Sequence, residues 1–382
     1  MKKRNLIALG VASAVFGLVP AVQAADVTFS GQANRAIMYA DDGADSDTFF
    51  VDSEVAPTLF NIMGEHALNE DVTMGMQIEA THSSNNSHAV TIGQKSSVGT
   101  NSFQERKLEV FFRSDKMGTL WLGQGEMASE NTSEVDLNEA SLAGIYSYTA
   151  DFGGNLGFRD SNGAALAIDT VIGDVANNFD GLGRDDRVRY DTPKLHGFML
   201  SVAAGTAKQW DASVNYAASF GELSFAAAVA YADPGDVYDW KHQYNGSLSV
   251  AHSGFSLTLA AGGQEYDDES RGLGDIFDDI DLKDPLSSLF GEDNPVSYYG
   301  KLGYSGNLVP MGKTSFAIDY KYTEHQVMVD DEYTSYGVGM VQAIDSASTE
   351  LYLGLRNHEL ERKGVSDIED IFVVTAGARV KF

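Results

Sequence analysis

Short segments that alternate between apolar and polar residues recur along almost the whole chain. In the last one, 371–382, one side carries Phe372, Val374, Ala376, Ala378, Val380 and Phe382, and the other carries Thr375, Gly377, Arg379 and Lys381. A period of two residues indicates a β-strand with one apolar and one polar face. Such a face points at a core in a soluble sandwich and at lipid in a membrane barrel, so other features must decide between them.

Sixteen segments of this kind are predicted, and most have the length of about ten residues that a tilted strand needs to cross a bilayer. They lie at 26–39, 57–68, 71–82, 104–114, 118–125, 185–192, 197–206, 209–218, 222–231, 242–251, 254–263, 296–305, 312–323, 334–344, 348–357 and 371–382.

The connections between these segments alternate in length. Short turns occur at 69–71, 115–118, 193–197, 220–222, 252–254 and 345–347, and 305–312 is somewhat longer. Most of the other connections are long and polar: 40–56, 83–103, 126–184, 264–295, 324–333 and 358–370. Short turns at one rim and long loops at the other are typical of outer-membrane barrels. The expected fold class is therefore all-β, a transmembrane antiparallel β-barrel of sixteen strands.

One residue does not fit this pattern. Arg35 shares a face of the first segment with Val27, Phe29 and Ala33. An arginine that faces lipid at mid-depth costs roughly 2–4 kcal/mol. Either a bulge shifts the phase of this strand, or protein covers that face.

The first 24 residues have the layout of a secretory signal peptide. Lys2, Lys3 and Arg4 precede an apolar run, and Val22 and Ala24 place small residues before a cleavage point after Ala24. We expect a leader at 1–24 and a barrel domain at 25–382. The absence of a long apolar run after the leader leaves a barrel as the way to span a membrane.

Charge and cysteine content narrow the function. Removal of the leader takes away three of the 26 basic residues and none of the 55 acidic ones. The remaining chain has 23 basic and 55 acidic residues and a net charge of −32. Such an acidic chain repels a phosphate backbone, so nucleic acid is not expected as a partner. The chain has no cysteine, which excludes a small fold held together by disulfides.

The sequence resembles the general porins of Gram-negative bacteria. The resemblance rests on the leader, the strand count, the alternating loop lengths, the final Phe382, and the phrases at 29–43, 105–125 and 185–198. It implies localisation in the cell outer membrane among lipid and lipopolysaccharide, and a homotrimer whose contact lies at the first and last strands and shields Arg35. It also implies that Phe382 is part of the signal that the barrel-assembly machinery recognises.

The resemblance makes the link at 126–184 an inward-folded constriction loop. From Met117 to Phe158 this region has no Lys or Arg and carries the candidate pore acids Glu126, Glu130, Glu134, Asp136 and Glu139. Carboxylates that line a pore favour cations. If the loop lay outside the barrel, the same acids would form a solvated surface.

Basic residues on the barrel wall are expected to oppose this loop. The alternation places Lys107, Arg113, Arg187 and Arg189 on the polar side of their strands. They are the candidate basic wall of the pore, or they hold the loop acids in salt bridges. The corresponding row of 57–68 carries Leu59, Asn61 and Met63, so this wall is thinner than is common in the family.

The loop at 263–295 is the most acidic of the external connections. It lacks the spacing and central glycine of an EF-hand. We expect its acids to concentrate cations at the mouth or to bind divalent ions shared with lipopolysaccharide, and we predict no specific metal site and no cofactor.

The expected function is passive diffusion of small hydrophilic solutes and ions, with a preference for cations. The alternatives are a substrate-specific channel and a plugged barrel that acts as an adhesin or envelope anchor. No enzymatic activity is expected, because the eight histidines are scattered and no nucleophile motif accompanies them.

Overall fold

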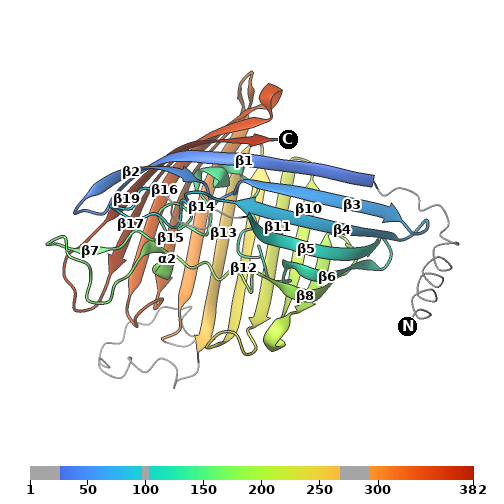
Figure 1. Cartoon of the computed structure of the whole chain (residues 1–382), viewed down its shortest axis with the longest axis horizontal. Coiled ribbons are helices and arrows are strands. Elements are labelled where there is room, and N and C mark those ends of the chain that lie inside the picture. Colours follow the sequence, from blue (N-terminus) through green and yellow to red (C-terminus); the bar gives the residue numbers. More distant parts are fainter. Residues whose placement is uncertain (1–25, 97–102, 267–292) are drawn as a thin grey trace, which may run out of the picture.

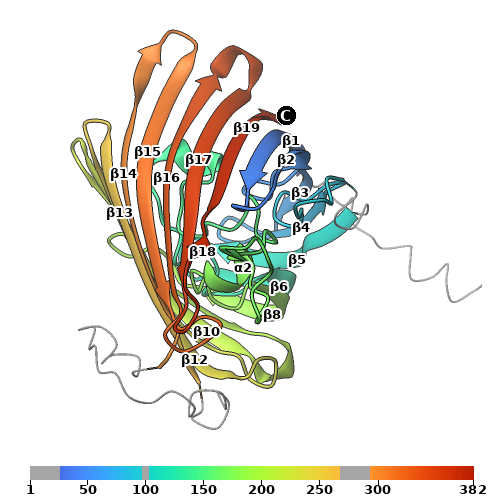
Figure 2. The same ribbon diagram turned by 90° about the vertical axis from the view of Figure 1, so that its left-hand side faces the viewer.

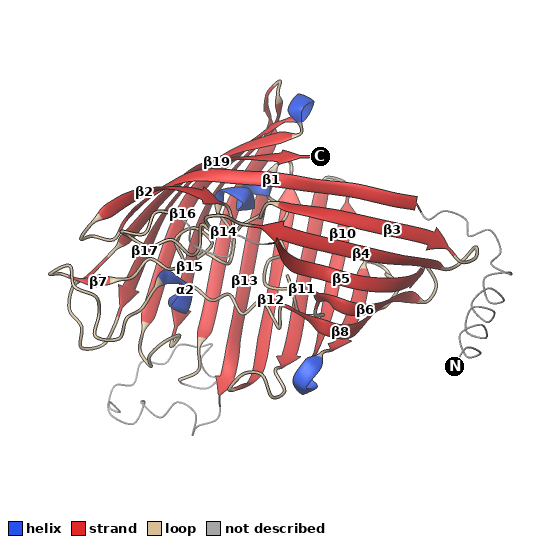
Figure 3. Cartoon of the chain, viewed as in Figure 1, coloured by secondary structure: helices blue, strands red, loops and turns tan. Residues whose placement is uncertain are grey.

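The computed structural model describes residues 26–96, 103–266 and 293–382. The predicted leader and most of the acidic loop at 263–295 lie outside the described residues. Almost all regular structure in the described residues is β-strand, and the strands surround a space into which several connections fold (Figures 1 and 3).

One sheet of seventeen strand segments forms the wall. The segments are β1 (Asp26–Asp41), β2 (Ser46–Asp52), β3 (Leu59–Ala67), β4 (Thr73–His82), β5 (Phe103–Ser114), β6 (Gly118–Glu126), β8 (Arg184–Asp191), β9 (Phe198–Ala204), β10 (Trp210–Phe220), β11 (Leu223–Asp233), β12 (Trp240–His252), β13 (Phe255–Tyr266), β14 (Val296–Val309), β15 (Gly312–Glu324), β16 (Glu332–Ile344), β17 (Thr349–Glu361) and β19 (Ile371–Lys381). Neighbouring strands are antiparallel, and β1 pairs with β19 to close the barrel.

Two of these segments share one position in the wall. Residues 35–41 of β1 pair with β2, and residues 26–32 of the same edge pair with β3. Seventeen segments therefore occupy sixteen positions, which confirms the predicted sixteen-stranded barrel. The prediction of a loop over all of 40–56 was wrong, because β2 lies within this range. The segment 53–58 separates β2 from β3, so β2 is only 7 residues long.

The two faces of the wall follow the alternation of the sequence. Apolar residues on the outer face are exposed, among them Met74, Leu108, Val110, Leu257 and Leu351. Inward positions on β12 and β13 are small or polar, such as Ser247, Ser249 and Thr258, and they are buried by chain that lies inside the barrel.

Arg35 does point outward, and it has a partner there. Asp52 lies directly opposite it on β2, and Arg35 Nη1 is 2.5 Å from Asp52 Oδ1. Asp52 also accepts hydrogen bonds from the backbone N–H groups of Ser84 and Asn85. Strand β1 keeps its phase, so an ion pair within the chain, rather than a bulge, reduces the cost of this arginine.

The remaining elements are short. They are η2 (Glu139–Ala143), α2 (Ile172–Val175), η3 (Thr206–Lys208), η5 (Asp345–Ala347) and a small sheet of β7 (Arg159–Asp160) and β18 (Ile368–Glu369). Within the described residues, no helix has the length and apolar character needed to cross a membrane.

Candidate functional site: the loop inside the barrel

The connection between β6 and β8, residues 127–183, folds into the barrel; we call it the constriction loop. Figure 2 shows α2, which belongs to this loop, within the ring of strands. Apolar residues of η2 and its neighbours, including Leu142 and Ile145, are buried against Val341, Tyr352 and Val373 of the wall. The loop therefore covers the inner face of one part of the barrel and narrows the space that remains.

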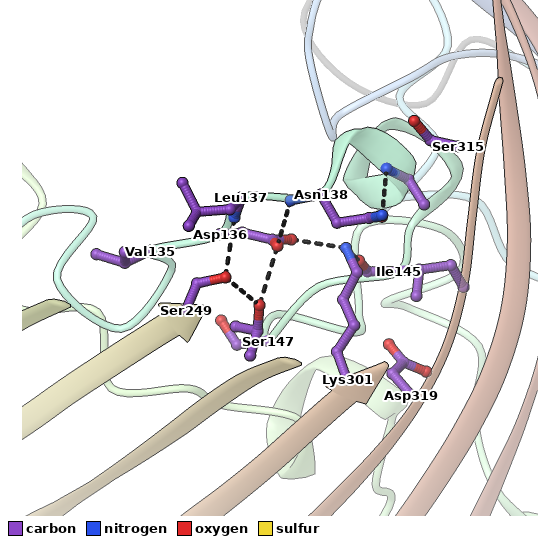
Figure 4. A network of polar contacts seen from close by, with 12 residues as sticks. Val135, Asp136, Leu137, Asn138, Ile145, Ser147, Ser249, Lys301, Ser315 and Asp319 are labelled. Atoms are coloured by element: carbon purple, nitrogen blue, oxygen red, sulfur yellow. Dashed lines mark hydrogen bonds and ion pairs between the residues drawn. The ribbon is translucent and has the colours of Figure 1, made fainter. Parts of the chain in front are cut away.

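Polar contacts fix the first half of this loop to the wall (Figure 4). The backbone N–H of Leu137 donates to Ser249 Oγ at 3.0 Å. Lys301 Nζ is 2.6 Å from Asp136 Oδ2 and donates to the carbonyl oxygen of Ile145 at 2.8 Å. Asp136, one of the predicted pore acids, therefore lies in an ion pair with a fully buried lysine.

Two further basic residues of the wall donate hydrogen bonds to the loop. Lys321 Nζ donates to the carbonyl oxygen of Ser147 at 2.6 Å. Arg356 donates to the carbonyl oxygen of Gly144 at 2.9 Å and pairs with Asp319 at 2.6 Å. None of Lys301, Lys321 and Arg356 was predicted as a site residue, although their inward phase on β14, β15 and β17 was a signal that could have identified them.

A second charged group lies at the root of the loop, by which we mean residues 126–130 and 183–184, where the loop leaves β6 and enters β8. Glu126 is 3.0 Å from Lys107 and 3.5 Å from Arg184, and Glu130 is 3.0 Å from the same arginine. Their side chains are between 12% and 27% exposed, so they are partly open to the interior of the barrel. Carboxyls and cations thus meet at the loop root, and Arg184 is a member of this group that was not predicted from the sequence.

More carboxyls continue along the loop from this root. Glu134 accepts a hydrogen bond from Asn178, and Asp180 accepts hydrogen bonds from the hydroxyl and backbone N–H of Ser133. Burial raises the pKa of Glu130 and of Glu134 to about 7, and it raises the pKa of Asp180 to about 8. Arg184 opposes this effect at Glu130, because a nearby cation favours the ionised carboxylate.

A bulge adds one cation to this group. Glu79 of β4 lies opposite Lys107 and Ala80 lies opposite Glu105, so Arg106 is an extra residue on β5. Its Nε donates to Glu79 Oε1 on the inner face at 2.9 Å. Strict alternation would have pointed Arg106 outward, and a bulge can re-aim a side chain in this way.

The other predicted basic residues lie in different surroundings. Arg187 is buried, and its Nη2 is 2.6 Å from Glu109 Oε2. The Nε of Arg189 is 2.8 Å from Asp191 Oδ1. Both arginines also donate to carbonyl oxygens at the root of the loop. Arg113 pairs with Glu65 at the far end of β5 from the loop root, near the turn at 115–117.

Glu139 lies apart from the group at the loop root. Its carboxylate is 2.9 Å from Lys313 Nζ, and both side chains are about half exposed. Of the five predicted acids, the structure therefore brings Glu126, Glu130 and Glu134 together, and it places Asp136 and Glu139 at separate ion pairs. Among the described residues, no group of three or more His, Asp or Glu is arranged to hold a metal ion.

The middle of the constriction loop extends toward the long external connections. Strand β7 pairs with β18 of the last of these connections, and Arg159 is 3.0 Å from Asp42 of the first. Arg362 bridges Asp331 and the hydroxyl of Thr170. This part of the loop therefore covers one side of the barrel mouth.

Solved structures share this architecture at low sequence identity. An anion-selective porin from Comamonas acidovorans is 16% identical, with a TM-score of 0.58, and the match covers 94% of this chain and 100% of the other. A loop-deletion mutant of OmpT, an outer membrane protein of Vibrio cholerae, is 13% identical with a TM-score of 0.57 and the same coverage. The trimer form of in-vitro folded OmpT from Vibrio cholerae is 14% identical with a TM-score of 0.53, again with the same coverage.

Among curated proteins, no sequence matches this chain. The family model for Gram-negative porins matches residues 11–363, which is most of the chain. Together with the closed barrel, this match places the protein in the outer membrane. The chain belongs to the Gram-negative porin family.

Proposed function

We propose that the protein is a diffusion channel for small hydrophilic solutes and ions that prefers cations. The observation that carries the proposal is the excess of carboxyls over cations at the loop root. Arg106 and Lys107 are each already paired with a carboxylate, and Arg184 is shared between Glu126 and Glu130. The remaining loop acids Glu134 and Asp180 are hydrogen-bonded to the neutral side chains of Asn178 and Ser133. They add negative charge as they ionise, which happens as the pH rises through their pKa values of about 7 and about 8, and this charge favours cations.

The selectivity of a fold relative does not transfer to this chain. The porin from Comamonas acidovorans is anion-selective by description, but at 16% identity it shares only the fold. Selectivity depends on which side chains line the constriction, and these must be judged in each chain separately.

We also propose a homotrimer, by analogy with the trimer form of OmpT from Vibrio cholerae. The outward faces of β1 and β19 are the proposed contact. The ion pair of Arg35 and Asp52 on the outer face would be shielded there from lipid. Lipid and lipopolysaccharide would surround the rest of the outer face.

The test is the reversal potential of the refolded protein in a planar bilayer under a potassium chloride gradient. We expect a potential that favours potassium, and conductance that changes in groups of three equal steps. The variant Glu134→Gln with Glu130→Gln should reduce the preference several-fold, and Arg106→Gln should increase it. Lys116→Gln is the control, because Lys116 pairs with Asp71 at an exposed turn away from the constriction.

The outcomes separate the alternatives. Anion preference in the unmodified protein would refute the role of the loop carboxyls. Silence from a correctly folded barrel would favour a plugged adhesin or envelope anchor, a second candidate that the mouth contacts of β7 and Arg362 support. Conductance that saturates with one solute alone would favour a substrate-specific channel.

A further inference from the structure

A row of inward side chains crosses five neighbouring strands between the loop root and the turn at 115–117. The row consists of Glu65, Gly75, Phe111, Trp121 and Arg189, each directly opposite the next. Short turns of outer-membrane barrels lie on the periplasmic side, so this row faces the periplasmic half of the channel. Its centre is an aromatic pair on a wall that faces water.

The indole of Trp121 is held in one orientation. Its Nε1 donates to Asp191 Oδ2 at 2.8 Å, and its ring centroid is 4.9 Å from that of Phe111. Phe111 is fully buried and lies over Gly75, where an added Cβ would be 2.2 Å from Phe111 Cζ. Trp121 is only partly buried, so part of its fixed ring faces the interior of the barrel.

Two ion pairs border this ring. Arg113 is 2.6 Å from Glu65, with 45% and 36% of the side chains exposed, and its guanidinium is 5.1 Å from the centre of the Phe111 ring. Arg189 is 2.8 Å from Asp191. The border therefore presents two cations and two carboxylates, which together have no net charge.

The geometry points to a subsite for a neutral, ring-shaped solute rich in hydroxyl groups, a pyranose sugar, stacked on Trp121. The C–H face of such a ring is apolar and fits a rigid aromatic surface. Its hydroxyl groups can donate to the exposed Glu65 and accept from the exposed Arg113. A charged solute gains less here, because each charge would meet a group of the same sign beside its partner.

A purely structural explanation accounts for only part of the row. An aromatic ring over a glycine protects the exposed backbone of a strand, which explains Phe111 over Gly75. It does not require a second, larger ring above the first, or a hydrogen bond that sets the angle of that ring. The subsite depends on the proposed channel, because a solute must reach the inner wall.

The experiment compares maltose with sorbitol, a linear polyol, as blockers of potassium chloride current through the channel. In the unmodified protein, maltose on the periplasmic side should reduce the current in a saturable way and several-fold more than sorbitol at equal concentration. Trp121→Leu should remove this difference, and Trp121→Phe should retain part of it. Trp210 lies on the outer face, so Trp210→Leu is the matched control. Maltose should block the current through this variant as it does in the unmodified protein.

Equal effects of maltose and sorbitol, or an unchanged maltose block in Trp121→Leu, would overturn the subsite while the channel itself stands. Block by benzoate but not by maltose would overturn the assignment to neutral sugars. A folded barrel without current would instead contradict the proposed function. In that case a maltose-induced change in tryptophan fluorescence that Trp121→Leu abolishes still supports the subsite, and no change overturns it.

Discussion

Individual carboxyls of the constriction loop and of its root differ in charge state because they differ in burial and in partners. Glu126 contacts both Lys107 and Arg184, whereas Glu134 is held by the neutral amide of Asn178. Desolvation favours the protonated acid, and a nearby cation favours the ionised one. Equal formal charges in the sequence therefore do not contribute equally to the field in the channel.

The first prediction concerns pH. The pKa of Glu130 and Glu134 is raised to about 7 and that of Asp180 to about 8, so these carboxyls are protonated below these values and ionise as pH rises through them. Cation preference should therefore increase as pH rises past 7, as measured by reversal potentials at a series of pH values.

Two checks follow from the sign of these shifts. The variant with Glu130→Gln and Glu134→Gln should show a flatter pH dependence, and a preference that falls with rising pH would contradict the assignment. Because the folded barrel binds these protons more tightly than the unfolded chain, the contribution of these groups to the free energy of unfolding should decrease from about pH 4.5 up to about 7.

At the scale of elements, the constriction loop and strands β12–β17 stabilise each other. The strands supply inward hydroxyl groups and basic side chains, and the loop supplies backbone N–H groups, backbone carbonyls and Asp136. The loop buries polar wall positions that would otherwise face water, and several of them, such as Ser247, Ser249 and Lys301, have a hydrogen-bond partner in the loop. The position of the constriction therefore depends on residues far from it in sequence.

The second prediction tests this dependence at Lys301. Lys301→Met leaves Asp136 without its cation, and breaking a buried ion pair from one side costs about 3–5 kcal/mol. We expect faster hydrogen exchange in residues 132–147 and noisier current through the channel, because this part of the loop loses two contacts at once.

The control is Lys313→Met, which breaks an exposed pair worth about 0–1 kcal/mol and should change neither measurement. Adding Asp136→Leu to Lys301→Met should restore part of the loss, since no buried carboxylate is then left unpaired. Equal hydrogen exchange in the Lys301 and Lys313 variants would show that the loop is held by other contacts.

At the scale of the whole molecule, the barrel closes where its two ends meet. The N–H of Phe382 donates to the carbonyl oxygen of Gly31 at 3.0 Å, and the N–H of Gly31 donates back at 3.1 Å. The Phe382 ring is exposed on the outer face, with its centroid 5.8 Å from that of Phe29. The backbone of the last residue completes the sheet, while its ring remains accessible.

The third prediction separates these two roles of Phe382. We propose that the ring is recognised by the assembly machinery, whereas closure needs only backbone hydrogen bonds. Phe382→Ser should lower the amount of barrel in the outer membrane of cells several-fold and leave refolding in detergent almost unchanged. Phe372→Ser, at the other end of β19, is the control, and an equal loss in cells for both variants would refute the signal.

The sequence by itself determined the barrel, its sixteen positions and the inward or outward face of most residues. Alternation with a period of two is a local property, and a closed barrel satisfies every strand without long-range information. The acidic character of the loop was equally visible, because charge is additive along a chain. Even the outward position of Arg35 followed from alternation alone.

Only the tertiary structure decided which side chains share the constriction. One extra residue opposite Glu79 and Ala80 turned Arg106 inward, and a bulge leaves no period in the sequence to reveal it. Asp136 and Glu139 have the same formal charge as Glu130, but each contacts a different lysine because of the path of the loop across the wall. Ion pairs form between residues that are distant in the chain, so their partners follow from packing and not from pattern.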